Sequence, residues 1–280
     1  MIAPSLPQLI RQHAVNIPLP GGEHGDTIGI EAVADIAEKL SMPGWQVEAE
    51  SLSMGVIPLR YLRNMDSITA SMQRKLLQSR IAQVGMGGLG GTLLETFART
   101  GIGRIRAADG DAFEESNLNR QALATMHTLG APKAWAGTER CLELNPSIEL
   151  DAQESFLAQE SLPTFIQGCS VAVDALGGLQ TRTALQDAAS AAGVPLVTGA
   201  LAGWTGYVSV VLPGSLGPAQ IMGNDNSAEE ELGCPAAAVN FFASLMAGEV
   251  IKLLTHGQSP LAGHMLVVDL DALSFDRISL

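Results

Sequence analysis

The sequence predicts an α/β fold: a mostly parallel sheet with helices on both faces, followed by antiparallel strands near the C-terminus. Between residues 81 and 201, short apolar runs alternate with helical segments, which is typical of parallel strands joined by crossover helices. Residues 203–214 favour a strand with turns, and residues 265–280 alternate as closing strands do. Hydrophobic residues make up 46% of the 280-residue chain and charged residues 16%, so much of the sheet is expected to be covered.

Each expected element has its own pattern. Short apolar runs predict buried strands at 81–85, 104–109, 148–153, 171–175 and 195–201. Helices are predicted around these strands, at 65–79, 91–101, 131–144, 158–167 and 180–192. An acidic segment, 224–233, is expected to be an exposed loop, and a long apolar helix is predicted after it at 235–257.

Residues 1–58 are expected to form a short N-terminal extension to a main domain at 59–280. The first 28 residues are rich in proline and glycine, a composition that favours loops. A short amphipathic helix is predicted at 28–40, ending before Pro43 and Gly44, where continuation would be costly. Three roles stay open for Trp45 and this helix: packing on the sheet, extending a dimer interface, or gating a ligand site of the main domain.

Charge and cysteine content exclude several classes of protein. Sixteen Lys and Arg residues against 29 Asp and Glu leave a net charge of −13, which opposes broad binding to nucleic acid or anionic lipid. The three cysteines form no C-x-x-C pair, so we expect reduced thiols in a cytoplasmic protein. The N-terminus lacks a signal-peptide pattern and no apolar stretch of 18 residues is evident, so no membrane partner is expected.

A glycine-rich loop lies directly between the strand predicted at 81–85 and the helix that follows. Gly85, Gly87 and Gly90 form the G-x-G-x-x-G pattern of a Rossmann-like turn, in which glycine permits the tight turn, close approach of a phosphate, and helix packing. Asp109 follows at the end of the next strand, where a carboxylate can bind ribose hydroxyls. Nucleotide binding is therefore favoured over a turn without a ligand, with NAD, FAD, SAM and ATP all open at this point.

The next segment narrows the choice of nucleotide. It carries a dense polar set: Asp109, Asp111, Asn117, Asn119, Arg120, Gln121 and, further on, Lys133. A guanidinium and an ammonium here suit a triphosphate and its departing pyrophosphate better than they suit a nicotinamide cofactor. ATP is therefore favoured, and the alternative is a solvated loop with incidental charges.

Several motifs in order resemble the ThiF, MoeB and HesA family of E1-like adenylyltransferases. They are RYLRN at 60–64, VGMGGLGG, DGDAFEESNLNRQ, GAPKA, VDALGGLQTR and the late ASLMAGEVIKLL. The resemblance covers about residues 59–280, including the final SFDRISL. It does not separate the thiamine, molybdopterin and other sulfur-carrier branches of the family.

The resemblance implies an activity and a set of nucleotide-binding residues. Family members bind ATP and Mg²⁺ and adenylate the C-terminal carboxylate of a small ubiquitin-like sulfur-carrier protein of the ThiS/MoaD kind, releasing pyrophosphate. Carried onto this sequence, the resemblance implies that ATP is bound by Gly85, Gly87, Gly88, Gly90, Asp109, Asp111, Asn117, Arg120, Gln121 and Lys133.

Four residues are implied to take part in the chemistry. Arg120 and Lys133 match family positions that neutralise phosphate charge. Arg63 matches the second arginine of the family's R-Y-x-R-Q motif, which reaches the partner subunit's phosphates in dimeric members, and Asn64 stands where the motif has Gln. Asp174 matches the first Asp of the family's D-x-x-D-N motif and is the candidate Mg²⁺ ligand. The resemblance therefore implies a homodimer with composite sites.

The sequence also departs from the family pattern. Gly177 and Gly178 stand where D-x-x-D-N has its second Asp and its Asn. Asp174 either moves toward the missing carboxylate's place or serves as a structural acid at the strand end. The paired C-x-x-C zinc motifs of many relatives are absent, so no zinc is expected. Cys234, at the end of the acidic loop, is interpreted as a buried helix-start residue rather than a reactive thiol.

Three functions therefore compete. The leading one is adenylation of a sulfur-carrier protein by ATP. The second is a catalytically impaired E1-like protein that binds nucleotide as a scaffold, an alternative that Gly177 and Gly178 favour. The third, supported only by the glycine loop and Asp109, is a dehydrogenase, and the affinities for NADH and ATP would separate it from the other two.

Overall fold

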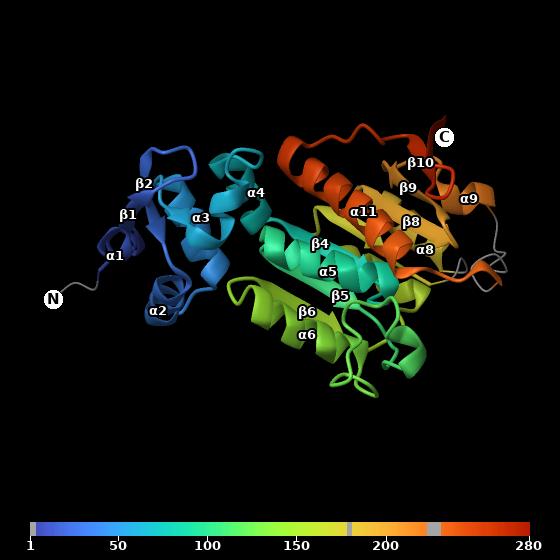
Figure 1. Cartoon of the computed structure of the whole chain (residues 1–280), viewed down its shortest axis with the longest axis horizontal. Helices are drawn as coiled ribbons and strands as arrows, with labels where there is room; N and C mark the ends of the chain where they lie inside the picture. The colour runs from blue at the N-terminus through green and yellow to red at the C-terminus, as the bar shows by residue number, and fades with distance from the viewer. Residues whose placement is uncertain (1–3, 178–180, 223–230) are drawn as a thin grey trace.

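The computed structural model describes residues 4–177, 181–222 and 231–280, and in this part of the chain it contains a large sheet and a small one (Figure 1). The large sheet has the strand order β11-β10-β9-β8-β7-β4-β5-β6. Its strands are β4 (Arg80–Val84), β5 (Arg104–Ala108), β6 (Glu149–Gln153), β7 (Val171–Asp174), β8 (Leu196–Ala202), β9 (Thr205–Val211), β10 (His264–Asp269) and β11 (Ser274–Ser279). Strands β4 to β8 pair in parallel and β9 to β11 are antiparallel, which confirms the predicted fold class.

Helices cover both faces of this sheet because its strands are apolar on both sides. Strand β4 shows the alternation: Ile81 packs into the cluster that contains Phe97 and Phe242, and Ala82 packs on the opposite side with Phe165. The first face carries α4 (Ala70–Gln78), α5 (Gly88–Thr100), α6 (Lys133–Leu144) and α11 (Ala236–His256). The second face carries α7 (Leu162–Ile166) and α8 (Arg182–Ala191), and α9 (Pro218–Met222) packs beside α8.

Helix α11 bears on the expectation that the chain has no apolar stretch long enough to span a membrane. It has the length and apolar composition to cross a membrane, with a mean hydropathy of 1.5 over its most apolar 18-residue window. Within the fold, 56% of that window is buried, and α11 packs against α5 and β8. Because a buried core helix passes the same test, this helix is weak support for a membrane span.

The N-terminal residues are more ordered than their composition suggests, so the prediction of loops over the first 28 residues is wrong. They contain α1 (Leu6–His13), β1 (Val15–Pro18) and β2 (His24–Ile28), followed by α2 (Ile30–Leu40), α3 (Gly44–Ser53) and β3 (Ile57–Pro58). Pro7 lies in the first turn of α1, where a missing N–H costs nothing. Ile10, Ile28 and Ile36 are buried together, and this shared cluster stabilises the elements against their loop-forming composition.

Helix α3 is absent from the sequence prediction. Pro43 is its N-cap and Gly44 its first residue, so the pair that ends one helix also begins the next. The polar helix expected at 65–79 begins only at Ala70, because the Thr69 side chain caps it by accepting the Met72 backbone N–H; residues Leu59–Asn64 form a short 3₁₀ helix, η1.

Trp45 attaches the N-terminal elements to the edge of the large sheet. Its indole Nε1–H donates to Glu149 Oε2 at 2.9 Å, and the Arg104 guanidinium lies 4.9 Å from its ring centroid. Its backbone N–H donates to the Ser147 carbonyl. Of the three roles left open for this residue, packing on the sheet is the one that these contacts describe.

A buried polar network reinforces the same junction. Glu48 of α3 is 0% exposed and accepts hydrogen bonds from Tyr61 Oη and Ser147 Oγ, both at 3.0 Å. The Arg60 guanidinium lies 3.4 Å from the same carboxylate and also donates to Asn145. Burial raises the pKa of Glu48 despite Arg60, and burial beside Glu48 raises that of Tyr61.

Candidate active site

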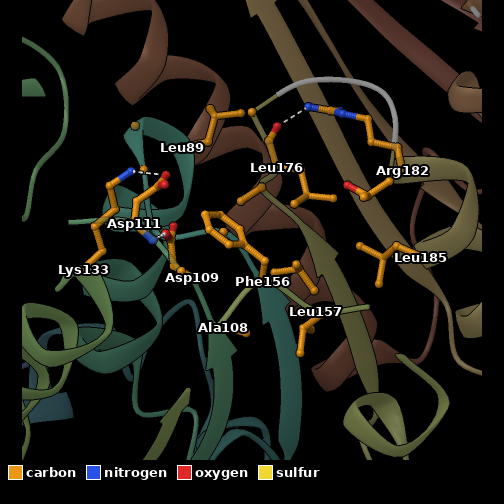
Figure 2. Close-up of a pocket in the computed structure, with 18 of the residues that line it drawn as sticks. Leu89, Ala108, Asp109, Asp111, Lys133, Phe156, Leu157, Leu176, Arg182 and Leu185 are labelled. Carbon is orange, nitrogen blue, oxygen red and sulfur yellow. Dashed lines mark hydrogen bonds and ion pairs between the residues drawn. The ribbon is translucent and has the colours of Figure 1, made fainter. Parts of the chain in front are cut away.

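A cavity of about 560 Å³ opens at the carboxyl ends of β4, β5 and β7. The chain crosses to opposite sides of β4 when it forms β5 and β7, so this is the topological switch point at which α/β sheets bind ligands. Its walls come from the loops after these strands, from the loop after β6, and from the beginnings of α5, α6 and α11. Figure 2 shows the polar side of the cavity, with Asp109, Asp111 and Lys133, facing an apolar side that carries Phe156, Leu157 and Leu176.

The glycines of the loop between β4 and α5 have different roles: Gly85 and Gly90 are required by the packing of the backbone, and Gly87 leaves space at the cavity. Gly85 has a φ of +97°, and a Cβ there would lie 2.3 Å from the Ala175 carbonyl oxygen. A Cβ on Gly90 would lie 2.1 Å from the Gly85 carbonyl oxygen, so both glycines are needed by the fold. Gly87 is the N-cap of α5, and a Cβ there would meet nothing closer than the Gln121 amide at 3.7 Å. Its open side faces the cavity, where it leaves room for a ligand.

Gln83 braces the same loop and was missed in the sequence analysis. It is a fully buried amide in β4, and its Nε2 donates to the carbonyls of Gly85 at 3.0 Å and Gly90 at 2.9 Å. Its Oε1 has no hydrogen-bond partner among the described residues. A lone polar residue within an apolar strand was the available signal, since buried polar groups usually hold another part of the fold.

Asp109 lies at the end of β5, beside the glycine loop. Its two carboxylate oxygens accept the backbone N–H groups of Met86, at 2.6 Å, and of Asp111, at 2.9 Å. This pair of bonds fixes the carboxylate at the mouth of the glycine turn. The site has the position and acceptor character that a ribose requires.

Lys133 brings a positive charge to the same polar side of the cavity (Figure 2). It is the first residue of α6, and its backbone N–H donates to the Asp111 carbonyl. Its Nζ lies 3.0 Å from Asp111 Oδ2, with the lysine side chain 8% exposed and the aspartate side chain 53% exposed. Two of the residues that the resemblance assigns to ATP binding are thus brought together, and the carboxylate of Asp111 remains open to solvent.

The remaining polar candidates line the wall between Asp111 and the glycine loop. Arg120 donates to the Ser116 carbonyl at 2.9 Å and to Asn119 Oδ1 at 3.0 Å. Asn117 accepts the Glu114 backbone N–H, and Gln121 is buried with an Oε1 that lacks a partner among the described residues. The cavity therefore brings Arg120 and Gln121, from one turn of the chain, together with Lys133 from the start of α6.

Asp174 lies beneath the cavity rather than among the described residues that line it. It is 1% exposed, accepts the Thr198 hydroxyl at 2.7 Å and the Leu176 backbone N–H at 3.1 Å, and lies 3.3 Å from the Arg182 guanidinium. Both oxygens thus have protein partners, which is the arrangement of a structural acid at a strand end.

Gly177 does line the cavity, and a Cβ built on it would meet no atom of the described residues within 4 Å. The space that a family carboxylate would use is therefore open at this position, whereas Gly178 lies outside the described residues. Among the described residues, the carboxylates that line the cavity are Asp109 and Asp111, and no group of three or more His, Cys, Asp or Glu side chains gathers as a metal site.

The donor set nevertheless fits one particular metal. Mg²⁺ is commonly held by one or two carboxylates together with phosphate oxygens and water. Asp111 offers a half-exposed carboxylate beside the cations that would face a triphosphate. The residues present therefore fit a Mg²⁺ ion that arrives with its nucleotide, and do not form a metal site without it.

Arg63 is distant from this cavity. It is exposed on η1, whose Tyr61 hydroxyl lies against Gly101, the C-cap of α5. The glycine loop begins α5 at its other end, so the 13-residue helix separates them by about 20 Å. Arg63 does not appear among the described residues that line the cavity.

The cysteines differ in their surroundings. Cys141 and Cys169 are buried, and burial raises the pKa of the Cys141 thiol to about 12 and that of Cys169 above its ordinary value. Cys234 is half-buried, precedes the N-cap of α11, and lines the cavity. Its interpretation as a helix-start residue agrees with this position, although the side chain is more open than expected.

Comparison with known proteins gives this arrangement a family. A curated protein of Thermus thermophilus, named sulfur carrier protein adenylyltransferase, is 33% identical over 233 residues, or 79% of this chain and 86% of its own length. Sulfur carrier protein ThiS adenylyltransferase of Escherichia coli is 33% identical over 219 residues, covering 75% of this chain and 86% of that protein.

Solved structures share the fold. E. coli MccB, crystallised with ATP, superposes with a TM-score of 0.68 at 20% identity, covering 79% of this chain and 70% of that one. The ThiF family model matches residues 61–280. The chain therefore belongs to the ThiF family.

Proposed function

We propose that this protein uses ATP to adenylate the C-terminal carboxylate of a small ubiquitin-like sulfur-carrier protein, of the ThiS or MoaD kind. The observation that carries the proposal is the single cavity in which the glycine loop, Asp109, Arg120 and Lys133 meet. Two curated relatives at 33% identity are named as sulfur-carrier adenylyltransferases, which supports the same activity.

The residues of the cavity have different roles in the proposed reaction. Asp109 holds the ribose, the N-terminus of α5 offers backbone N–H groups to phosphate, and Arg120 and Lys133 neutralise the triphosphate. A carboxylate oxygen of the carrier attacks the α-phosphorus, the bond to the bridging oxygen breaks, and pyrophosphate leaves with that electron pair. The carrier supplies the nucleophile, so the enzyme's contribution is to position the reactants and stabilise the charge.

Mg²⁺, when bound, would spread the negative charge of the phosphates. Asp111 is the residue placed to hold it, with Lys133 as its neighbour. Asp174, whose oxygens are engaged by Thr198 and Leu176, would support the loop that carries Gly177 instead.

The direct test is ATP–pyrophosphate exchange with a purified ThiS-like and a MoaD-like carrier. We expect exchange that requires the carrier and that disappears when its terminal glycine is removed. ATP binding without exchange for any carrier would reject the enzymatic proposal.

The alternative, a scaffold that binds nucleotide without turning it over, has one observation in its favour: Gly177 leaves open the space where the family has a carboxylate. It predicts ATP binding without exchange in the wild type, and exchange in the Gly177→Asp variant. Exchange by the wild type that Arg120→Ala abolishes would reject it.

Competition between NADH and ATP tests the dehydrogenase hypothesis, and we expect ATP to bind more tightly because of the cations around the cavity.

We further propose a homodimer in which Arg63 of one subunit completes the cavity of the other. Its exposed position, about 20 Å from the glycine loop of its own chain, supports this assignment. A subunit-mixing experiment tests it: Arg63→Ala and Lys133→Ala proteins, each inactive alone, should on mixing recover about a quarter of wild-type exchange, because half of the dimers would hold one intact site. No recovery from subunits that demonstrably exchange would reject shared sites.

A further inference from the structure

Phe156 is an unusual residue in the cavity wall. It lies in the loop after β6 and lines the cavity, yet 75% of its surface is exposed. An exposed phenyl ring gains free energy when a ligand covers it, and Figure 2 shows this ring projecting into the cavity from the segment that also carries Leu157.

The backbone places this ring beside the residue assigned to the ribose. The Asp109 backbone N–H donates to the Gln153 carbonyl at 3.1 Å, which joins the end of β5 to the start of the Phe156 loop. A Cβ on Gly110, the residue after Asp109, would lie 2.6 Å from the Phe156 ring. The absence of a side chain at 110 thus permits the ring to approach the backbone of Asp109.

Much of the cavity wall on the side of the ring is apolar, although Ser155 and Gln159, which flank the ring in the sequence, also line the cavity. The ring's neighbours along this part of the wall are Ala108, Leu157, Leu162, Leu176 and Leu185. Arg120 and Lys133 lie on the other side, whereas Arg182 lies near Leu176 and Leu185 and donates to the Leu176 carbonyl at 2.6 Å (Figure 2). An apolar half next to Asp109 and a cationic half beyond it match a nucleotide, with the planar base on the first and the phosphates on the second.

We propose that Phe156 is a nucleotide-binding residue that stacks on the base of the bound nucleotide, in a subsite kept open by Gly110. The inference rests on the proposed use of ATP and adds how the base is held: by a face of Phe156 and apolar walls. Stacking of a base on an aromatic ring changes affinity by roughly 5- to 150-fold when the ring is removed.

Isothermal titration of ATP and of inorganic tripolyphosphate tests the proposal. Phe156→Ala should weaken ATP binding by roughly 5- to 150-fold and leave tripolyphosphate binding unchanged, because only ATP has a base. Phe156→Tyr should restore ATP affinity. Phe275→Ala, which removes an exposed phenyl from β11 outside the cavity wall, is the matched control and should bind ATP as the wild type does.

Gly110→Ala provides a second, independent perturbation. Made in the otherwise wild-type chain, the added methyl group should displace the ring and weaken ATP binding. Made together with Phe156→Ala, it should have little further effect on ATP binding. If Phe156→Ala binds ATP as tightly as the wild type, or loses tripolyphosphate equally, the base subsite is rejected while the proposed function stands. If the wild type binds tripolyphosphate but gains nothing from the adenosine of ATP, the subsite is rejected as well. Failure of the wild type to bind ATP at all would reject the proposed function and the subsite together.

Discussion

Lys133 Nζ lies 3.0 Å from Asp111 Oδ2, and the two side chains differ sharply in exposure, at 8% and 53%. The buried member of the pair is the cation, held at the first turn of α6 with its ammonium at the cavity edge. A positioned cation in a partly enclosed site stabilises developing charge far better than a solvated one does.

Lys133→Ala should therefore lower the rate of ATP–pyrophosphate exchange by about 100- to 1,000-fold. Lys39→Ala, which removes an exposed lysine paired with Asp35 on α2, is the matched control. Exchange within a few-fold of wild type in a folded Lys133→Ala protein would show that Lys133 does not stabilise the transferring phosphates.

Asp109→Asn should weaken ATP binding by about tenfold or more. The amide can still accept one of the two backbone N–H bonds, from Met86 or Asp111, but its NH₂ group would face the other donor. Asp151→Asn, on the neighbouring strand β6 with its carboxylate exposed toward Arg106, is the control. Equal affinity for ATP in Asp109→Asn, measured by titration calorimetry, would contradict the ribose assignment.

Gly177→Asp should lower the Mg²⁺ concentration needed for half-maximal exchange, since a carboxylate would enter space that is open at this position. Gly177→Asn has a similar volume without the charge and should leave the Mg²⁺ dependence near that of the wild type. The measurement is exchange rate against Mg²⁺ concentration. The same dependence in both variants would mean that position 177 does not face the metal.

Gln83→Leu should reduce the free energy of unfolding by about 1–3 kcal/mol, because two hydrogen bonds to the glycine loop are lost inside the sheet. The leucine keeps the volume, so little of the loss comes from a cavity. Urea denaturation measures it, with Gln167→Leu at an exposed position as control. An unchanged midpoint would show that the cost of burying Gln83 Oε1 without a partner among the described residues offsets the stability gained from the two hydrogen bonds of its Nε2.

Glu48 should make the stability of the protein depend on pH. Burial raises its pKa above the ordinary 4.5, over the opposing effects of Arg60, Tyr61 and Ser147. The folded state then holds the proton to a higher pH than the unfolded state does, so this contribution to stability falls as pH rises from 4.5 through the raised pKa.

The stability of Glu48→Gln should therefore increase relative to that of wild type as pH is raised above 4.5. Urea unfolding at a series of pH values measures how the difference in unfolding free energy between Glu48→Gln and wild type changes with pH. Losing the charge that faces Arg60 adds a constant to this difference and does not change its slope. Glu38→Gln on the exposed side of α2 is the control. A flat difference between Glu48→Gln and wild type would mean that the pKa of Glu48 is the same in both states.

The elements that could be predicted share a physical cause. The apolar runs at 81–85 and 171–175 are strands because both faces of a parallel strand are buried. The glycine turn could be predicted because few residues other than glycine can adopt the positive φ of Gly85 or fit at Gly90, which lies against the Gly85 carbonyl. Asp109 could then be placed from its spacing after this turn. The helix predicted at 28–40 is confirmed as α2, whereas α1 and α3 escaped prediction because a shared apolar cluster, rather than local propensity, stabilises them.

By itself, the sequence determined the alternation of strands and helices between residues 81 and 201, the glycine turn and the cations that follow it, because these depend on local periodicity and short-range spacing. Only the tertiary structure decided that Asp174 lies beneath the cavity with Thr198 and Arg182. It also decided that Arg63 lies at the far end of α5 and that Phe156 comes to lie over Gly110. These relationships join residues from distant parts of the chain, and packing of the sheet and its crossovers sets them.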